Sequence, residues 1–284
     1  MEAITREEKI ISGENLTPIT RKEMFLAKAA GMDVETPEPI TREEIFLSKI
    51  QGGNDGTGGG GESEDFTISD ASYLFHKGSR MEALEQLCAK LKNITTCSEM
   101  FRDAVATTEQ GSKYGNLSFS LDSHWCTVFS SMFRGCSELV SIPEFDTSKG
   151  KQFIWMFYGC TKLKTVPKID INDATDVRYM FDSCQFLENL YLYNIRKSIQ
   201  LGNGSSWGRK LTVDSLIHTI KELCSVESTQ TLTIASDSQT KISGLYCKII
   251  DDTNEKKPME LCESTDDGAM TLIDYAAEKG WTIA

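Results

Sequence analysis

Apolar and polar residues recur along the middle of the chain with a period of 24 residues. The octapeptide MFRGCSEL begins at Met132, MFYGCTKL at Met156 and MFDSCQFL at Met180. Further apolar residues precede and follow each octapeptide at fixed distances; in the first copy they are Phe129, Leu139, Ile142 and Phe145. Units of this length bury such positions only by stacking on one another, so the pattern predicts a stack of repeats.

A degenerate copy, CSEMFRDA, begins at Cys97 and has Ala104 where the later copies have cysteine. The interval from Met100 to Met132 is 32 residues, and we interpret TTEQGSKYG within it as a loop insertion. Ladders of Leu and Ile at this period indicate leucine-rich repeats. The predicted fold is therefore α/β: a leucine-rich-repeat solenoid of 24-residue repeats over residues 97–200.

The segments that flank the repeats have the patterns of closing elements. Before the repeats, one apolar stripe at helical spacing predicts a helix from Arg80 to Leu91, within an N-terminal cap at residues 66–96. After them, residues 201–284 predict helix-strand rungs and a C-terminal cap. Thr212 caps a helix, TLTIAS forms a strand, and LYCKII pairs with MELC in a hairpin. A last helix stops at Gly280, and WTIA ends the chain as a strand.

The first 50 residues contain three related units, ITREEKII, ITRKEMFL and ITREEIFL. In each unit a Thr precedes a Glu by three positions, which is the capping box that starts a helix. Helices of about 8–10 residues are marginal in water unless they pack on something. Their apolar face is Phe25, Leu26, Phe46 and Leu47. Residues 1–50 therefore form either a small self-packed cluster or a segment that docks on a larger assembly, and residues 51–65 form a Gly-rich flexible linker.

Composition narrows the classes of function. The net charge of -12 argues against a broad basic surface for nucleic acid or for an anionic membrane. The N-terminus has no secretion signal and no apolar run reaches the length of a membrane span, so we expect synthesis in a cytosol. Nine cysteines without a C-x-x-C pair are expected to be thiols there.

The sequence shows no constellation typical of an enzyme. His76, His124 and His218 lie in no metalloprotease or zinc-finger spacing, and we interpret His218 as a boundary residue on the polar side of its helix. There is no nucleophile elbow, P-loop or dinucleotide fingerprint. We therefore expect no catalytic residues, no cofactor and no metal ion.

The repeated cysteines admit two interpretations. Stacked repeats place equivalent residues about 4.8 Å apart, which lies within the range for a disulfide after release from the cell. The favoured interpretation is a column of small apolar residues that fills the core. A single column does not surround a tetrahedral metal ion.

Recognition residues are expected where the copies disagree. Asp146 recurs as Asp170 and Asn194, which indicates a structural turn rather than catalysis. The candidate ligand-contact positions do not repeat, and several are aromatic residues that favour interfaces. They are Ser141, Glu144, Trp155, Thr165, Lys168, Tyr179, Asn189, Tyr191 and Tyr193. The alternative is that these are ordinary solvated or edge positions.

Two parts of the sequence resemble known families of proteins. MFRGCSELVSIPEFDTS and its copies, from Cys97 to Asn194, resemble the BspA-like bacterial leucine-rich repeat, whose units stack into a solenoid. The tail is similar to the closing segment of such proteins in phages and prophages of gut Firmicutes. The segment TPITRKEMFLAKAAG…ETPEPITREEIFLSKI looks like the leader of phage structural proteins, where it precedes tail-fibre, baseplate or head-fibre modules.

The resemblances imply a non-enzymatic, virion-associated protein made in the bacterial cytoplasm. Residues 1–50 would contact phage structural proteins, and the repeats would attach to a host cell-surface protein or glycan. Fibre proteins are often trimeric, so the resemblance is compatible with a homotrimer, although the sequence contains no coiled-coil pattern. A structural decoration protein and a bacterial surface adhesin are the alternatives; the missing secretion signal counts against the adhesin.

Overall fold

The computed structural model describes residues 70–78, 81–203, 207–254 and 256–284. The chain divides into two compact units, Met1–Ser63 and Glu64–Ala284, and the described residues belong to the second. The predictions for residues 1–50, including Phe25, Leu26, Phe46 and Leu47, and for the linker at 51–65 lie outside the described residues.

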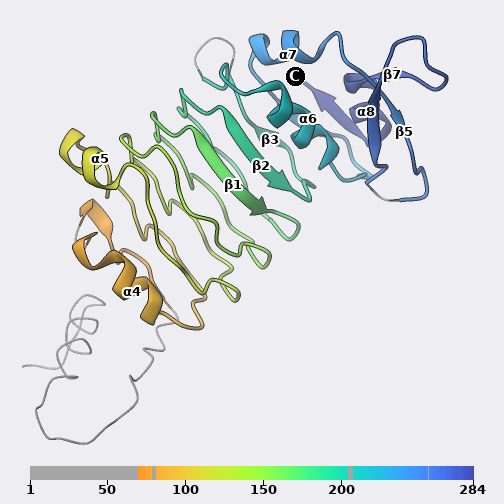
Figure 1. The fold of residues 1–284 in the computed structure, drawn as a ribbon. Helices are drawn as coiled ribbons and strands as arrows, with labels where there is room; N and C mark the ends of the chain where they lie inside the picture. Colours follow the sequence, from red (N-terminus) through yellow and green to blue (C-terminus); the bar gives the residue numbers. More distant parts are fainter. Residues whose placement is uncertain (1–69, 79–80, 204–206, 255) are drawn as a thin grey trace, which may run out of the picture. The chain divides into compact units, whose positions relative to one another are not determined.

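The described part of the chain is a mixed α/β structure with small, open sheets (Figure 1). This agrees with the α/β class predicted from the sequence. Its short 3₁₀ helices are η1 (His76–Gly78) and η2 (Met81–Ala83), and its α-helices are α4 (Leu84–Lys90), α5 (Thr108–Tyr114), α6 (Val213–Lys221), α7 (Ser236–Ile242) and α8 (Leu272–Glu278). Its strands are β1 (Thr165–Asp170), β2 (Asn189–Tyr193), β3 (Ile199–Gln200), β4 (Gln230–Thr233), β5 (Tyr246–Ile249), β6 (Met259–Cys262), β7 (Met270–Thr271) and β8 (Trp281–Ile283). Strands pair in parallel as β1–β2 and β3–β4–β8, and antiparallel as β6–β5–β7.

Successive copies of the repeat lie on one another through backbone hydrogen bonds. We call the segments 71–78, 97–104, 129–136, 153–160 and 177–184 the Met-Phe segments. In each step, the Phe N–H donates to the carbonyl of the next segment's Met. The bonds are Phe75 to Met100 (2.8 Å), Phe101 to Met132 (2.8 Å), Phe133 to Met156 (2.9 Å) and Phe157 to Met180 (2.9 Å). The period seen in the sequence is therefore the spacing of stacked segments.

The same step stacks the phenylalanine rings and aligns the cysteines inside. Phe133 and Phe157 stack with ring centroids 5.5 Å apart and an interplanar angle of 2°. Cys160 Sγ donates to the Phe133 carbonyl at 3.1 Å, and its side chain is fully buried. All nine cysteines are free thiols, and the repeated ones form the packing column that the sequence favoured.

Each Met-Phe segment makes a sharp bend just before the cysteine column. Gly135 and Gly159 have φ of 76° there, and Asp103 and Ser183 occupy the same left-handed region in other copies. A residue with a Cβ is uncommon in that region. The repeated Gly-Cys of two copies therefore reflects a backbone requirement of the bend.

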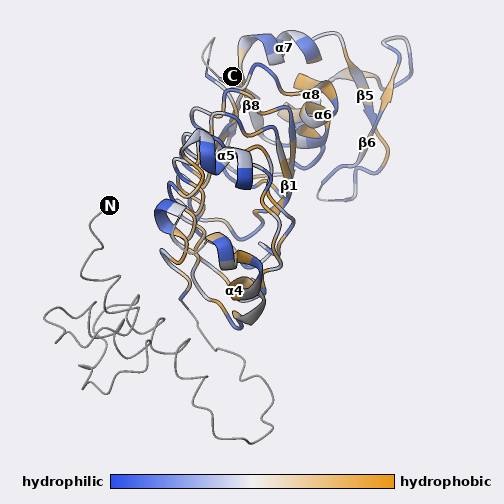
Figure 2. Ribbon diagram, turned by 60° about the vertical axis from the view of Figure 1, so that its left-hand side comes forward, coloured by the Kyte–Doolittle hydropathy of each residue, from blue (hydrophilic) through white to orange (hydrophobic). Residues whose placement is uncertain are grey.

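A second side of the stack is formed by the strand part of each repeat. Parallel bridges join Asn116 to Ser141, Ser141 to Thr165 and Thr165 to Asn189. The Phe133 ring packs on Phe145 from this second side, with centroids 6.3 Å apart. The core therefore lies between the Met-Phe side and the strand side, which Figure 2 shows apart from one another. Outward residues of the two sides face away from each other.

The structure adds a copy at residues 71–78, within the segment predicted only as an N-terminal cap. Ala71 N–H donates to Thr96 at 2.9 Å, and Phe75 stacks on Phe101 with centroids 4.9 Å apart. This copy has Leu74 in place of Met and Gly78 in place of Cys, which hid it in the sequence.

The insertion TTEQGSKYG is a helix, α5, rather than the loop that we expected. Thr107 Oγ1 accepts from Gln110 N–H at 3.3 Å, while Gln110 Oε1 accepts from Thr107 N–H at 3.1 Å. This reciprocal capping box satisfies free amides at the helix start, and its Thr-x-x-Gln signature is present in the sequence.

The C-terminal elements follow the predicted order. Thr212 caps α6, β5 pairs antiparallel with β6, and Gly280 ends α8 in the left-handed region at φ 83°. Lys279 is buried beneath these elements, where its Nζ donates to the Lys221 carbonyl at 3.1 Å and to the Tyr275 hydroxyl at 2.9 Å. Burial lowers the pKa of the Lys279 ammonium to about 8. In the part of the chain that the structure describes, no helix is long and apolar enough to span a membrane.

Candidate functional site

The structure distributes the predicted contact residues over two opposite surfaces. Trp155 and Tyr179 lie on the Met-Phe side. The strand side carries Ser141, Glu144, Thr165, Lys168, Asn189, Tyr191 and Tyr193. These residues therefore do not form one site.

Part of the strand-side group has structural partners. Ser141 Oγ donates to Asn116 Oδ1 at 2.8 Å, and Thr212 Oγ1 donates to Asn189 Oδ1 at 3.5 Å. Ser141, Thr165 and Asn189 are half-buried and lie in one bridged row. Their places in this row account for these three residues structurally, and no ligand is needed to explain them.

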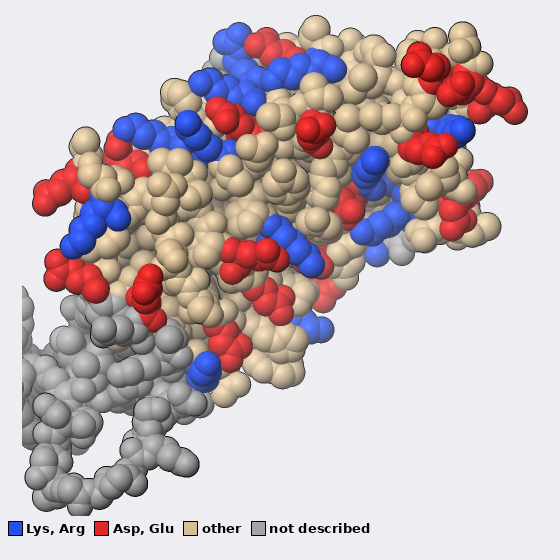
Figure 3. All heavy atoms as spheres, viewed as in Figure 1, with Lys and Arg blue, Asp and Glu red and all other residues tan. Residues whose placement is uncertain are grey.

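Of the remaining strand-side residues, Lys168, Tyr191 and Tyr193 cluster around His218, whereas Glu144 is exposed and lies outside this cluster. Lys168 Nζ lies 5.3 Å from the centroid of the Tyr193 ring, and the His218 ring meets Tyr193 edge-on at 4.8 Å. Tyr191 packs on His218 in the same way at 5.4 Å and is 38% exposed. Figure 3 shows positive and negative side chains interspersed on the face that carries β1 and β2, without a field of one sign.

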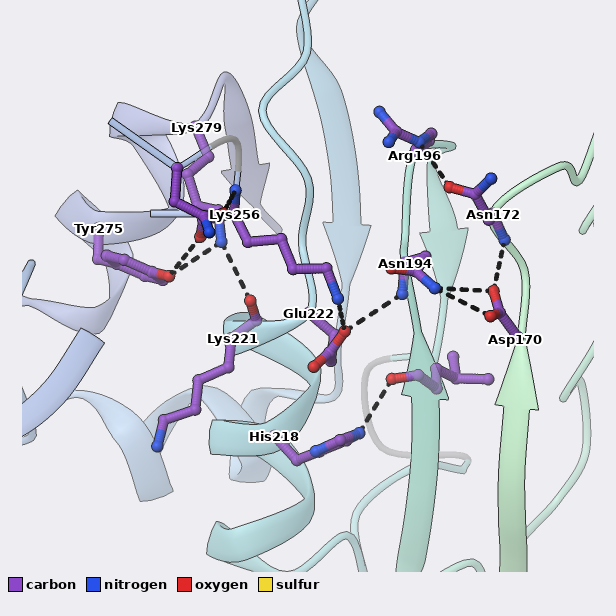
Figure 4. Close-up of polar contacts among 12 residues, drawn as sticks. Asp170, Asn172, Asn194, Arg196, His218, Lys221, Glu222, Lys256, Tyr275 and Lys279 are labelled. Atoms are coloured by element: carbon purple, nitrogen blue, oxygen red, sulfur yellow. Dashed lines mark hydrogen bonds and ion pairs between the residues drawn. The ribbon is translucent and has the colours of Figure 1, made fainter. Parts of the chain in front are cut away.

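Helix α6 covers the open edge of β2 with side chains (Figure 4). We call Ser215, His218 and Glu222 the α6 clamp. Ser215 Oγ accepts from Leu190 N–H at 3.0 Å, His218 Nε2 donates to the Leu192 carbonyl at 3.0 Å, and Glu222 Oε2 accepts from Asn194 N–H at 3.3 Å. The clamp supplies the hydrogen bonds that a further strand would have made.

The half-buried position of His218 agrees with the expectation of a boundary residue, but the sequence did not predict its bond to β2. Its ring is half-buried in the clamp, and burial lowers its pKa below the ordinary 6.5 despite the nearby Glu222 carboxylate, which raises it. The neutral ring, with the proton on Nε2, fits the bond to Leu192. Sequence spacing could not show this role because it depends on a strand distant in the chain.

The recurring Asp146, Asp170 and Asn194 have the structural role that their repetition predicted. Asp146 Oδ1 accepts from Ser148 N–H at 2.9 Å. Asn194 Nδ2 donates to both carboxylate oxygens of Asp170 at 2.9 Å (Figure 4). These side chains fix the bend that follows the strand part of each repeat.

Aromatic and cationic side chains gather on the Met-Phe side. We call Arg134, Trp155, Tyr158 and Tyr179 the Trp–Tyr strip. The Arg134 guanidinium lies over the rings of Trp155 and Tyr158, at 5.2 and 5.4 Å from their centroids. Trp155 and Tyr179 stack with centroids 6.2 Å apart and an interplanar angle of 14°. Tyr179 is 47% exposed, so its ring is available to a ligand.

The backbone beneath the strip has a repeated conformation. Trp155 and Tyr179 have φ of 56° and 57°, and Glu99 and Ser131 share this left-handed conformation at 55° in earlier copies. The repeat therefore imposes the conformation, whichever side chain is present. The fold offers the same outward position in each copy, and only some copies place a ring there.

A groove lies beside Tyr179, where the stack of Met-Phe segments ends. Phe129 N–H donates to Gln152 at 2.8 Å, and Phe153 N–H donates to Asp176 at 2.8 Å. Among the described residues, no equivalent bond runs from Val177, and β3, the next strand along the chain, pairs with β4. The groove has a volume of about 260 Å³ and is lined by Val177, Arg178, Tyr179, Ser198, Ile199, Gln200, Thr231 and Thr233.

Sequence patterns gave no sign of the polar wall of this groove. Gln200, Thr231 and Thr233 come from β3 and β4, outside the clear repeats, and no periodic signal marked them. Among the described residues, no group of three or more His, Cys, Asp or Glu side chains could hold a metal ion.

Comparison with known proteins finds one partial similarity. A family model described as "Mycoplasma protein of unknown function, DUF285" matches residues 95–204. The match covers Met-Phe segments and the strands beside them, so it concerns the repeated part of the chain. No curated protein matches the chain. No solved structure matches it either.

Proposed function

We propose that the described unit is a leucine-rich-repeat solenoid of the BspA-like type and that it works as a binding module without enzymatic activity. The support is the stacking of equivalent residues, Phe on Phe and strand on strand, at the period of the sequence repeat. Solenoids of this kind offer long outward surfaces built from positions that vary between copies.

The observation that carries the binding proposal is the Trp–Tyr strip beside an open groove. Positions that repeat, such as Met156 and Phe157, are buried, whereas Tyr158 and Tyr179 are exposed and differ between copies. Exposed Tyr and Trp beside a cavity are typical of ligand and interface sites. The occupant of this surface is a host cell-surface protein or glycan.

The proposal places the protein on a phage particle. Its support is the resemblance of residues 1–50 to the leaders of phage structural proteins and of the repeats to those of phage-borne proteins. In this account residues 1–50 contact tail-fibre, baseplate or head-fibre proteins, and the repeat unit reaches the host.

Competition with phage adsorption tests the function. The purified full chain, added in excess to susceptible cells, is expected to bind them and to slow adsorption of particles. A chain carrying Trp155→Ala and Tyr179→Ala should compete less. Absence of competition at saturating protein would contradict host attachment and favour a decoration protein, whereas location on the bacterial surface without particles would favour an adhesin.

Residues 1–50 can be tested separately by deletion. A version of the chain that begins at residue 64, the start of the second compact unit, is expected to be absent from purified particles made in an otherwise unchanged phage. Immunoblotting of the particles measures incorporation, with the full chain as the control. Particles that retain the shortened chain at full occupancy would contradict docking through these residues.

A further inference from the structure

We propose that the groove beside Tyr179 binds an uncharged saccharide ring, which stacks on the open face of Tyr179. This inference rests on the proposed binding function and names the chemical class and the site of its ligand. Trp155 stacks on one face of Tyr179. Tyr179 also lines the groove, together with residues of β3 and β4 that follow it in the fold, whereas Trp155 does not line it. The residue one period further on is Asn203, which has no ring to continue the stack.

An aromatic face suits a sugar ring. The face of a phenol ring carries partial negative charge, and the axial C–H groups of a pyranose carry partial positive charge, so the two pack flat on one another. Tyr179 is 47% exposed and is held in place by Trp155 behind it. Arg134 in turn lies over Trp155, so the platform is supported by a second layer.

The opposite wall of the groove offers hydrogen-bonding groups of the kind that hydroxyls need. Thr231 and Thr233 lie two apart on β4, on either side of the buried Leu232, so both side chains face the groove. Among the described residues neither Thr hydroxyl has a hydrogen-bond partner. The Gln200 amide lines the same wall and reaches only the Gly202 carbonyl, at 3.3 Å.

The break in the backbone ladder adds donors. In earlier copies the N–H groups at the positions of Val177 and Tyr179 donate to the next copy, as Phe153 does to Asp176 and Trp155 to Arg178. Among the described residues the N–H groups of Val177 and Tyr179 have no such acceptor and belong to residues that line the groove. Oxygen atoms of a saccharide are suitable acceptors for them.

The charge of the groove favours a neutral ligand. Arg178 is its only ionic residue among the lining side chains described. The guanidinium is engaged in two bonds to Asp176, Nε to Oδ1 at 3.0 Å and Nη2 to Oδ2 at 2.6 Å. No unpaired cation among the described lining residues is left to recognise a phosphate or carboxylate, and no unpaired anion to recognise a basic peptide.

A two-stage binding experiment on the full chain tests the inference. The full chain is first applied to a printed array of neutral and acidic oligosaccharides from bacterial walls and animal mucins. The best neutral oligosaccharide is then titrated by calorimetry into the wild-type chain and its variants, while intrinsic tryptophan fluorescence, to which four tryptophans contribute, gives an independent signal. We expect a neutral oligosaccharide to bind and to change the tryptophan fluorescence.

Matched variants locate the site. Tyr179→Ala is expected to weaken binding by about tenfold or more, equivalent to about 1.4 kcal/mol. Tyr179→Phe keeps the ring and should retain affinity within about threefold, which separates loss of the platform from misfolding. Thr233→Val removes one hydroxyl with little change of shape and should cost about threefold to tenfold, the value of one hydrogen bond. Trp125→Ala removes a tryptophan that is 56% exposed and does not line the groove, and it should leave the affinity unchanged.

The outcomes separate this inference from the function on which it rests. Cell binding without binding of any neutral oligosaccharide, or with an extended peptide in the groove, would overturn the saccharide and leave host attachment standing. Equal affinity of wild type and Tyr179→Ala would also overturn it. Binding of a neutral oligosaccharide that depends on Tyr179, together with no competition for adsorption, would support the inference and contradict host attachment.

Discussion

At the scale of single residues, repetition along the chain separates packing from surface. Cys160 recurs, is fully buried and donates to a backbone carbonyl, so its role is in the core. Tyr158 stands next to the repeated Phe157 and does not recur, and its ring is exposed beneath Arg134. Sequence could make this distinction because a buried column must be filled in each copy, whereas an outward position is free to vary.

Thiol reactivity should follow this distinction. Burial raises the pKa of the Cys136 thiol to about 12 and that of Cys160 well above its usual range. Only Cys262 is partly exposed. Desolvation also raises the pKa of its thiol, so the advantage of Cys262 comes from access, and at pH 8 a chromogenic disulfide reagent is expected to label it rapidly relative to the other eight cysteines, which react only after unfolding. Cys262→Ser should abolish the rapid phase; rapid labelling that survives this change would contradict the buried column.

The titration of His218 should make stability depend on pH. Burial lowers its pKa in the folded protein below the 6.5 of an ordinary histidine, so the unfolded chain binds the proton more tightly. The contribution is complete above pH 6.5 and is lost as the pH falls through the lowered value. Glu222, Lys256 and Lys221 also act on this ring, so comparison with a variant is needed.

The comparison uses His218→Gln, whose side-chain amide can still donate to the Leu192 carbonyl but does not titrate. We expect the free energy of unfolding, measured by urea denaturation, to fall between pH 7.5 and 5 by less in the variant than in the wild-type chain. Identical pH profiles of the two proteins would show that His218 titrates alike in the folded and unfolded states.

At the scale of elements, the local sequence pattern predicts the helix that closes the stack but not its contacts with the neighbouring strand. The amphipathic pattern and Thr212 predicted α6, but not that Ser215, His218 and Glu222 would serve as hydrogen-bond partners for β2. The edge of a parallel sheet leaves unpaired backbone groups that must be covered. Which side chains cover them depends on packing between distant segments.

The α6 clamp can be tested at its most buried member. Ser215→Ala removes the acceptor for the buried Leu190 N–H and should lower the free energy of unfolding by about 1–3 kcal/mol. Ser118→Ala, at an exposed serine on the strand side, is the matched control and should change it by less than about 0.5 kcal/mol. Equal stabilities of the two variants in urea denaturation would contradict the clamp.

At the scale of the described unit, the period in the sequence predicted the stacking of residues 97–184. It predicted neither the copy at 71–78 nor the groove. The copy at 71–78 lacks both Met and Cys, and its backbone bonds to the next segment and the stacking of Phe75 on Phe101 reveal it. The groove lies where the backbone bonds between Met-Phe segments end and the chain continues into β3, which pairs with β4, and the period in the sequence does not encode this ending. Tyr179 was predicted as a contact residue because it is aromatic and differs between copies. The structure adds the neighbouring residues that line a groove with it.

The central claim is that this surface attaches the chain to a host cell, and the most direct measurement is equilibrium binding of the fluorescently labelled full chain to susceptible cells. The account predicts saturable binding that Trp155→Ala with Tyr179→Ala weakens by about tenfold or more, equivalent to about 1.4 kcal/mol, while Trp125→Ala leaves it unchanged. Absence of saturable binding, or equal binding by all three proteins, would contradict it.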